Sequence, residues 1–255
     1  MGKYIVKNDY NDLTLGTIKI NNINFQKVSD LMDFGWKLVH ISHERSLSDD
    51  SFPRFKESTY VYRNNSDFTK GLRLYEDYVD YQYTFHMDHR MISKLQEKQP
   101  NIKLTEFPTG IVTIEDKVIG QQIPYYDGYI KINEILKEGI SEEQFYDYIR
   151  KIIDIFKELV DNNIIYMDIH FGNILINPLD EDIKLIDFEK EYIHIDNNTS
   201  YGLKEYLEML KRLKNLFIKL SEYGEFDFIN INKNFNSIDE LYQIIPEKGK
   251  SLIKR

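Results

Sequence analysis

The chain has 255 residues, enough for one large domain or for two small lobes that share a cleft. Its hydrophobic content of 42% and charged content of 29% are typical of a globular protein, and the low counts of Gly (12) and Pro (6) disfavour long disordered or collagen-like regions. The net charge of −9 disfavours nucleic acid as a partner, and the absence of cysteine excludes disulfides, thiolate metal sites and cysteine nucleophiles.

Neither a targeting segment nor a membrane span is predicted. Residues 1–12 mix Lys, Asn and Asp and lack the apolar core of a signal peptide. No apolar run approaches the roughly 20 residues that a membrane-spanning helix needs. We therefore expect a cytoplasmic protein.

The first half of the chain is predicted to be rich in β-strands. An N-terminal extension, residues 1–35, contains an alternating segment at 18–25 that indicates a strand and a short helical segment at 28–34. A polar, Ser-rich loop is expected at 43–58 and a helix at about 83–97. The remaining apolar runs predict a five-stranded antiparallel sheet, with strands at 36–41, 59–62, 71–75, 111–114 and 118–123.

The second half is predicted to be mainly helical. Ser141 and Gln144 form the sequence signature of a capping box, and apolar residues then recur at helical spacing to Leu159. A second long helix is expected at 203–220, where a stripe of Leu and Phe indicates core packing and, as an open alternative, a coiled-coil seam. Between them lie two short strands, 173–176 and 183–186, joined by a polar turn.

Three polar residues flank these two short strands. Asp168 and Asn173 stand five residues apart before the first strand, and Asp187 follows the second. A hairpin of this length brings all three toward one end, where two carboxylates and an amide suit a hard cation such as Mg²⁺ that is shared with phosphates. Each residue is also an ordinary turn former, which is the alternative for any one of them alone.

This pattern resembles a known family. Asp-x-x-x-x-Asn followed by an apolar residue and Asp-Phe is similar to the catalytic loop and metal-binding motif of the protein-kinase-like superfamily. The form Asp168-Ile-His170-x-Gly-Asn173 is closer to the aminoglycoside, choline and atypical kinases than to ordinary protein kinases. The resemblance implies a bilobal α+β fold, with an N-lobe at 36–124 and a small, mainly helical C-lobe at 125–255.

The resemblance also implies roles in the C-lobe. Asp168 would be the catalytic base or the carboxylate that orients the acceptor hydroxyl. Asn173 and Asp187 would hold the Mg²⁺ that accompanies ATP. His170 matches the loop histidine of the small-molecule kinases, with a role near the phosphates or, alternatively, a bracing hydrogen bond within the loop.

In the N-lobe the implied roles are less well marked. Asp88 stands where the family has an ion-pairing glutamate, and its basic partner at the phosphates would be Arg73 or Lys70; a solvated Asp88 is the alternative. Gln122 and Ile123 would contact adenine through backbone groups.

Some features depart from the family pattern. No Gly-x-Gly-x-x-Gly loop occurs, Tyr166 and Met167 replace the usual His-Arg, and Glu189 replaces the Gly after Asp-Phe. Zinc is disfavoured at the paired histidines, His40 with His43 and His86 with His89, because no third ligand is evident.

The expected function is a Mg-ATP-dependent kinase that transfers the γ-phosphoryl group to an acceptor hydroxyl. We favour an atypical Ser/Thr protein kinase over a small-molecule kinase of the aminoglycoside or choline type. The alternative from a different class is a pseudokinase, an interaction module that binds a nucleotide without turnover. The partner is accordingly a protein or a small-molecule hydroxyl acceptor.

Overall fold

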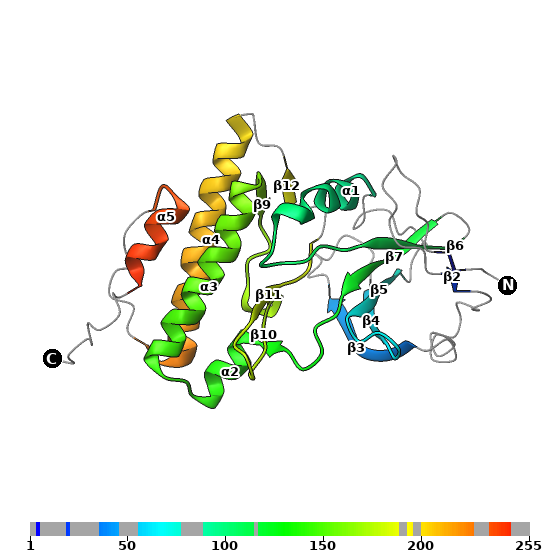
Figure 1. Ribbon diagram of the computed structural model, residues 1–255, viewed down its shortest axis with the longest axis horizontal. Helices are drawn as coiled ribbons and strands as arrows, with labels where there is room; N and C mark the ends of the chain where they lie inside the picture. Colours follow the sequence, from blue (N-terminus) through cyan, green and yellow to red (C-terminus); the bar gives the residue numbers. More distant parts are fainter. Residues whose placement is uncertain are drawn as a thin grey trace. The chain divides into compact units, whose positions relative to one another are not determined.

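The computed structural model divides the chain into two compact units with a mixed α+β fold. Unit 1 comprises Met1–Gln99 and Phe107–Asp127, and unit 2 comprises Pro100–Glu106 and Gly128–Arg255. The structure describes residues 4–5, 19–20, 36–45, 56–77, 89–114, 117–188, 193–195, 200–226 and 235–245. The helices and strands are labelled in Figure 1.

An antiparallel sheet of seven strands forms unit 1, in the order β2-β1-β6-β7-β5-β4-β3. The expected five strands are too few, because two-residue strands from the N-terminal extension join the edge beside β6. Of these two strands, β2 lies within the segment 18–25, for which a strand is predicted, whereas β1 is too short to carry a periodicity that the sequence could reveal. The strands are β1 (Tyr4–Ile5), β2 (Lys19–Ile20), β3 (Trp36–Arg45), β4 (Lys56–Asn64), β5 (Lys70–Asp77), β6 (Gly110–Ile114) and β7 (Lys117–Pro124).

One helix, α1 (His89–Lys98), also belongs to unit 1 and runs into a 3₁₀ turn, Gln99–Asn101. Its Gln96 donates to the carbonyl oxygen of Pro108 over 2.7 Å, and Gln99 accepts from the amide of Phe107 over 2.8 Å. These bonds hold the helix end to the segment that enters β6. The expected start of this helix lies outside the described residues, as does the short helix expected at 28–34.

Unit 2 contains α2 (Ile132–Glu138), α3 (Glu142–Asp161), α4 (Ser200–Gly224) and α5 (Ile238–Leu241), followed by a 3₁₀ turn, Tyr242–Ile244. The capping box predicted at the start of α3 is confirmed. Ser141 accepts from the amide of Gln144, and the Gln144 side chain accepts from the amide of Ser141. Because α3 buries its apolar stripe from Phe145 to Leu159, it forms the centre of this unit.

The core position of α4 differs from expectation at its N-terminal end. Leu203 and Leu207 are exposed, whereas the buried stripe consists of Met209, Leu210, Leu213, Leu216, Phe217 and Leu220. At 100° per residue, Leu203 lies about 20° and Leu207 about 60° beyond Leu210, the residue that bounds the buried stripe on that side. None of the described helices is long and apolar enough to cross a membrane.

Two small antiparallel sheets complete unit 2. One has the order β11-β10-β8, with β8 (Ile130–Lys131), β10 (Ile174–Ile176) and β11 (Ile183–Leu185). The other pairs β9 (Ile164–Tyr166) with β12 (Ile193–Ile195). The predicted hairpin is confirmed as β10 and β11, which run side by side in Figure 1.

The short segment Pro100–Glu106 belongs to unit 2, although the sequence around it belongs to unit 1. The Glu158 carboxylate on α3 accepts from the amides of Lys103 and Leu104, over 2.9 and 2.8 Å. The Thr105 hydroxyl, which is buried, donates to the carbonyl oxygen of Leu185 over 3.0 Å. Side-chain bonds to backbone groups therefore attach this segment to α3 and to β11.

Candidate functional site

The β10–β11 hairpin brings Asn173 and Asp187 to the same end. Ile174 pairs with Leu185, and one step beyond this pair the amide of Ile186 donates to the carbonyl oxygen of Asn173 over 3.0 Å. Asp187 follows directly. Antiparallel pairing alone thus places the residue before one strand beside the residues after the other.

Asn173 is the buried centre of the site, with 4% of its surface exposed. Its amide nitrogen donates to the Tyr166 hydroxyl over 2.9 Å, and to the carbonyl oxygen and Oδ2 of Asp168 over 3.0 and 2.7 Å. The Tyr166 hydroxyl has a single proton, which goes to the carbonyl oxygen of Ile186 over 2.9 Å. Tyr166 must then accept from Asn173, and this fixes the orientation of the Asn173 amide.

The amide oxygen of Asn173 remains after this assignment. Within the part of the chain that the structure describes, no donor reaches this oxygen. It is therefore an oxygen ligand that the network orients and leaves available.

Asp168 lies in the loop between β9 and the 3₁₀ turn Phe171–Asn173, with a quarter of its side chain exposed (25%). The side-chain amide of Asn173 donates to both the backbone carbonyl oxygen and one carboxylate oxygen of Asp168. A carboxylate that is held on one side and partly open to solvent is suited to orient a hydroxyl group. The hydrogen bond between Asp168 and Asn173 brings together the first two residues of the predicted motif.

His170 caps the 3₁₀ turn through its ring. Its Nδ1 accepts from the amide of Gly172 over 3.0 Å, so the neutral ring carries its proton on Nε2. That Nε2 lies 3.5 Å from Oδ2 of Asp168. A Cβ at position 172 would come within 2.9 Å of the imidazole, which explains why this position is glycine.

Asp187 has a backbone φ of +71°, in the left-handed region. This conformation costs a residue other than glycine about 1–3 kcal/mol and tends to occur at functional sites. The Tyr166 hydroxyl lies 3.3 Å from the Asp187 carbonyl oxygen, and the Tyr166 ring packs against Phe188 with centroids 5.2 Å apart. Tyr166 therefore links Asn173 to the Ile186–Asp187 segment.

The chemistry of these donors fits one type of metal ion. The oxygens of Asn173 and Asp187 suit Mg²⁺, which usually takes one or two protein ligands and fills its shell with phosphates and water. Among the described residues no group of three or more His, Cys, Asp or Glu side chains is arranged to hold a metal.

The predicted N-lobe residues belong to unit 1. Lys70 begins β5, is exposed and pairs with Asp67 over 2.8 Å, while Arg73 lies half-buried on the same strand opposite Gln121. Ile123 of β7 pairs with Gly71, and the carbonyl oxygen of Gln122 accepts from the amide of Thr109. The Gln122 side-chain oxygen is buried and accepts no hydrogen bond from the described residues.

Asp88 lies outside the described residues, so neither of its proposed partners is tested. The loop expected at 43–58 is described only at its ends, where the prediction is wrong, because residues 43–45 and 56–58 pair with each other as the ends of β3 and β4. Glu189, the residue that replaces the family glycine, is also outside the described part.

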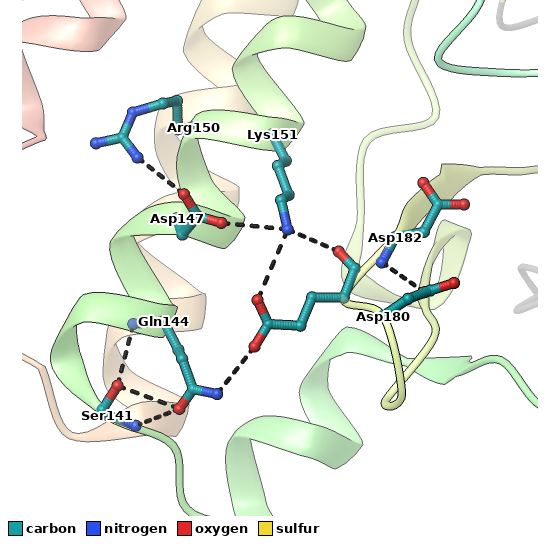
Figure 2. A network of polar contacts seen from close by, with 8 residues as sticks. Ser141, Gln144, Asp147, Arg150, Lys151, Asp180 and Asp182 are labelled. Carbon is teal, nitrogen blue, oxygen red and sulfur yellow. Dashed lines mark hydrogen bonds and ion pairs between the residues drawn. The ribbon is translucent and has the colours of Figure 1, made fainter.

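The opposite end of the hairpin is a turn bound to α3 by charged side chains (Figure 2). Lys151 of α3 donates to the carbonyl oxygen of Glu181 over 2.9 Å and pairs with Asp147 over 3.2 Å. Gln144 donates to Oε1 of Glu181 over 3.0 Å. Gln144, which completes the capping box of α3, thus also holds the turn.

Two contributions to the site escape sequence reasoning. The Tyr166 hydroxyl bridges the motif, although its position is marked only by a departure from the family pattern. Arg212 of α4 donates from Nη1 to the carbonyl oxygen of Met167 over 3.0 Å. No spacing could have indicated Arg212, because it lies on a different element, 45 residues from its partner.

Comparison with known proteins adds no assignment. No model of a known protein family matches the chain, and no curated protein matches its sequence.

Proposed function

We propose that this chain is a Mg-ATP-dependent phosphotransferase of the protein-kinase-like superfamily, a bilobal cytoplasmic kinase with its catalytic loop in unit 2. One observation carries the proposal. Asn173 joins Asp168 to Tyr166, and Tyr166 joins both to the Ile186–Asp187 segment, so the three motif residues share one network. A chance set of turn residues would have no reason to share a buried amide.

Asp168 is the residue that would orient the acceptor hydroxyl and receive its proton. Its carboxylate is fixed by Asn173 on Oδ2, with the His170 ring 3.5 Å away. Phosphoryl transfer asks mainly for positioning and for neutralisation of charge, rather than for covalent chemistry by the protein. A held carboxylate with the His170 ring beside it meets the first need.

Asn173 and Asp187 are the residues that would hold Mg²⁺, which supplies charge neutralisation to the transferring phosphoryl group. The amide oxygen of Asn173 is oriented and unused within the described residues, and the left-handed backbone at Asp187 is strain of the type found at such sites. The first observation favours Asn173 over other residues on the hairpin, and its place at the same end as Asn173 favours Asp187 over Glu181, whose backbone φ is also positive.

From unit 1, a cation at Arg73 or Lys70 would neutralise phosphate charge, with Asp88 as its partner. Adenine would lie at Gln122 and Ile123. The acceptor is a hydroxyl of a protein Ser or Thr, which we favour, or of a small molecule.

The test uses the full chain with labelled ATP and Mg²⁺, alone and with cell extract separated into proteins and metabolites. Asp168→Asn and Asp187→Ala are compared with the parent, and Asp180→Asn, on the opposite turn of the same hairpin, is the matched control. We expect label on an acceptor with the parent and the control, and a loss of at least about 100-fold with the other two. Equal labelling by all four proteins contradicts the assigned roles.

Nucleotide binding is measured separately by thermal unfolding. ATP with Mg²⁺ at about 100 times its dissociation constant stabilises a protein by about 2.7 kcal/mol. We expect this shift for the parent and for Asp168→Asn, and its loss for Asp187→Ala. A shift without any transfer by the parent would identify the pseudokinase alternative, and no shift at all would overturn the proposal.

A further inference from the structure

The peptide group that enters Asp168 is held by two donors. The carbonyl oxygen of Met167 accepts from the amide of Ile169 over 2.9 Å and from Nη1 of Arg212 over 3.0 Å. Because a peptide group is planar, holding its oxygen also fixes the direction of its N–H and of the bond to the next Cα. The Met167 carbonyl thus sets the orientation in which the chain reaches Asp168.

The peptide group that leaves Asp168 is held as well. Its carbonyl oxygen accepts from the amide nitrogen of Asn173 over 3.0 Å. Both peptide groups beside the Asp168 Cα are therefore restrained, and the direction of the Cα–Cβ bond follows from them. Ile169 and Asn173 belong to the same loop, whereas Arg212 anchors it to the long helix α4.

Arg212 is itself oriented by its helix. Its Nε lies 3.3 Å from Oε1 of Glu208, one turn earlier on α4. The guanidinium is a rigid planar fork, so the contact of Nε with Glu208 helps to direct Nη1 toward Met167. Arg212 is 44% exposed at its side chain, and the Met167 residue that it contacts is buried.

We propose that Arg212 is a positioning residue for Asp168. It holds the Met167 carbonyl and so keeps the carboxylate of Asp168 at the angle that an acceptor hydroxyl requires. This inference rests on the proposed function. A displacement of about 1 Å in a catalytic group costs on the order of 100-fold in rate. We therefore expect the loss of Arg212 to lower turnover and to leave nucleotide binding unchanged.

The experiment compares Arg212→Met and Arg212→Lys with Lys211→Met in the full chain. Lys211 is the matched control, because it also pairs with Glu208, over 3.5 Å. Its side chain is 69% exposed, and as the neighbour of Arg212 on the helix it projects from α4 in a different direction. Release of labelled phosphate from ATP with Mg²⁺ is measured, with water as the acceptor. We expect kcat to fall about 10- to 100-fold in Arg212→Met with an unchanged KM for ATP. Arg212→Lys restores part of the loss, and Lys211→Met matches the parent.

A second measurement reports on the loop without any turnover. Hydrogen exchange of the Ile169 amide, which shares the Met167 carbonyl with Arg212, should accelerate in Arg212→Met and stay slow in Lys211→Met, at equal thermal stability. If turnover and exchange of Arg212→Met both equal those of the parent, the inference is wrong while the proposed function stands. If the parent neither binds nor hydrolyses ATP, the proposed function fails, and the catalytic role of Arg212 falls with it.

Discussion

The two ends of the β10–β11 hairpin are built from different interactions. At the end that carries Asn173 and Asp187, one amide and one hydroxyl serve several partners through hydrogen bonds, and the bond that joins Asn173 to Tyr166 is buried. At the turn end, Lys151 and Gln144 of α3 hold Glu181 through partly exposed contacts. Buried shared protons fix angles, whereas exposed ion pairs fix a position only loosely.

Each end also contains a strained residue. The backbone φ is +71° at Asp187 and +58° at Glu181, where glycine would be comfortable. At the turn, the Glu181 side chain explains why this position is not glycine, because it accepts a hydrogen bond from Gln144 and lies 3.8 Å from Lys151. At the site end we propose that Asp187 is retained because its carboxylate would hold Mg²⁺.

The largest expected difference between the two ends concerns two asparagines that flank β10. Asn173→Ala removes the donor shared by Tyr166 and Asp168. Asn177→Ala removes an exposed bond from the amide of Leu179, of 3.0 Å, and a side-chain contact with Tyr129. We expect Asn173→Ala to lower the free energy of unfolding by about 1–3 kcal/mol and to reduce phosphoryl transfer at least about 100-fold.

For Asn177→Ala we expect a loss of at most about 1 kcal/mol and an unchanged rate of transfer. Urea unfolding and labelled-ATP turnover measure both variants. Equal loss of activity in the two variants would mean that the hairpin acts as one rigid unit, and would contradict the proposed difference between its two ends.

The next effect concerns the histidine cap. In Gly172→Ala the new Cβ meets the His170 ring at 2.9 Å, so the ring must turn away from the amide that it accepts from. The backbone at this position is not in the left-handed region, so we expect little change in stability and about a tenfold fall in turnover. In a His170→Ala background the same substitution should have no further effect, as a double-mutant cycle would show. An additive loss would assign the effect to the backbone instead.

How well the sequence predicts a contact depends on how far apart the two residues lie along the chain. The hairpin, the capping box at Ser141 and the meeting of Asp168 with Asn173 are local, so spacing and residue type sufficed. The contact of Arg212 with Met167 spans 45 residues and depends on how α4 packs, which no local pattern encodes. Of the added strands at the sheet edge, β2 lies within the predicted segment 18–25, whereas β1 is only two residues long and has no periodicity to reveal it. The exposure of Leu203 follows from its angular position on α4, outside the buried stripe.

A smaller effect is that the stability lost by mutation at the two ends depends differently on salt concentration. Glu181→Gln keeps an acceptor for Gln144 and removes the charge that faces Lys151. Because this pair is partly exposed, we expect a loss of at most about 1 kcal/mol at low salt, which disappears near 1 M salt, where the screening length is about 3 Å. Urea unfolding at both salt concentrations measures it. The loss in Asn173→Ala should persist at high salt, and a loss in Glu181→Gln that is equally insensitive to salt would contradict the ionic account of the turn.

The smallest effect appears only at alkaline pH. Tyr129 donates to Oδ2 of Asp182 at the turn end over 2.7 Å, and burial together with this carboxylate raises the pKa of Tyr129 from 10.0 to about 12. A raised pKa means that the folded state favours the protonated phenol, so its contribution to stability is complete below pH 10 and is lost as the pH rises through about 12. Tyr129→Phe lacks this group, so the stability of the parent relative to this variant should decline over that interval and be constant below it. Urea unfolding at stepped pH measures the difference, and an ultraviolet titration of the two proteins locates the pKa. A relative stability that stays flat through this interval would show that the Tyr129–Asp182 bond does not hold the turn, and would leave Glu181 as its attachment.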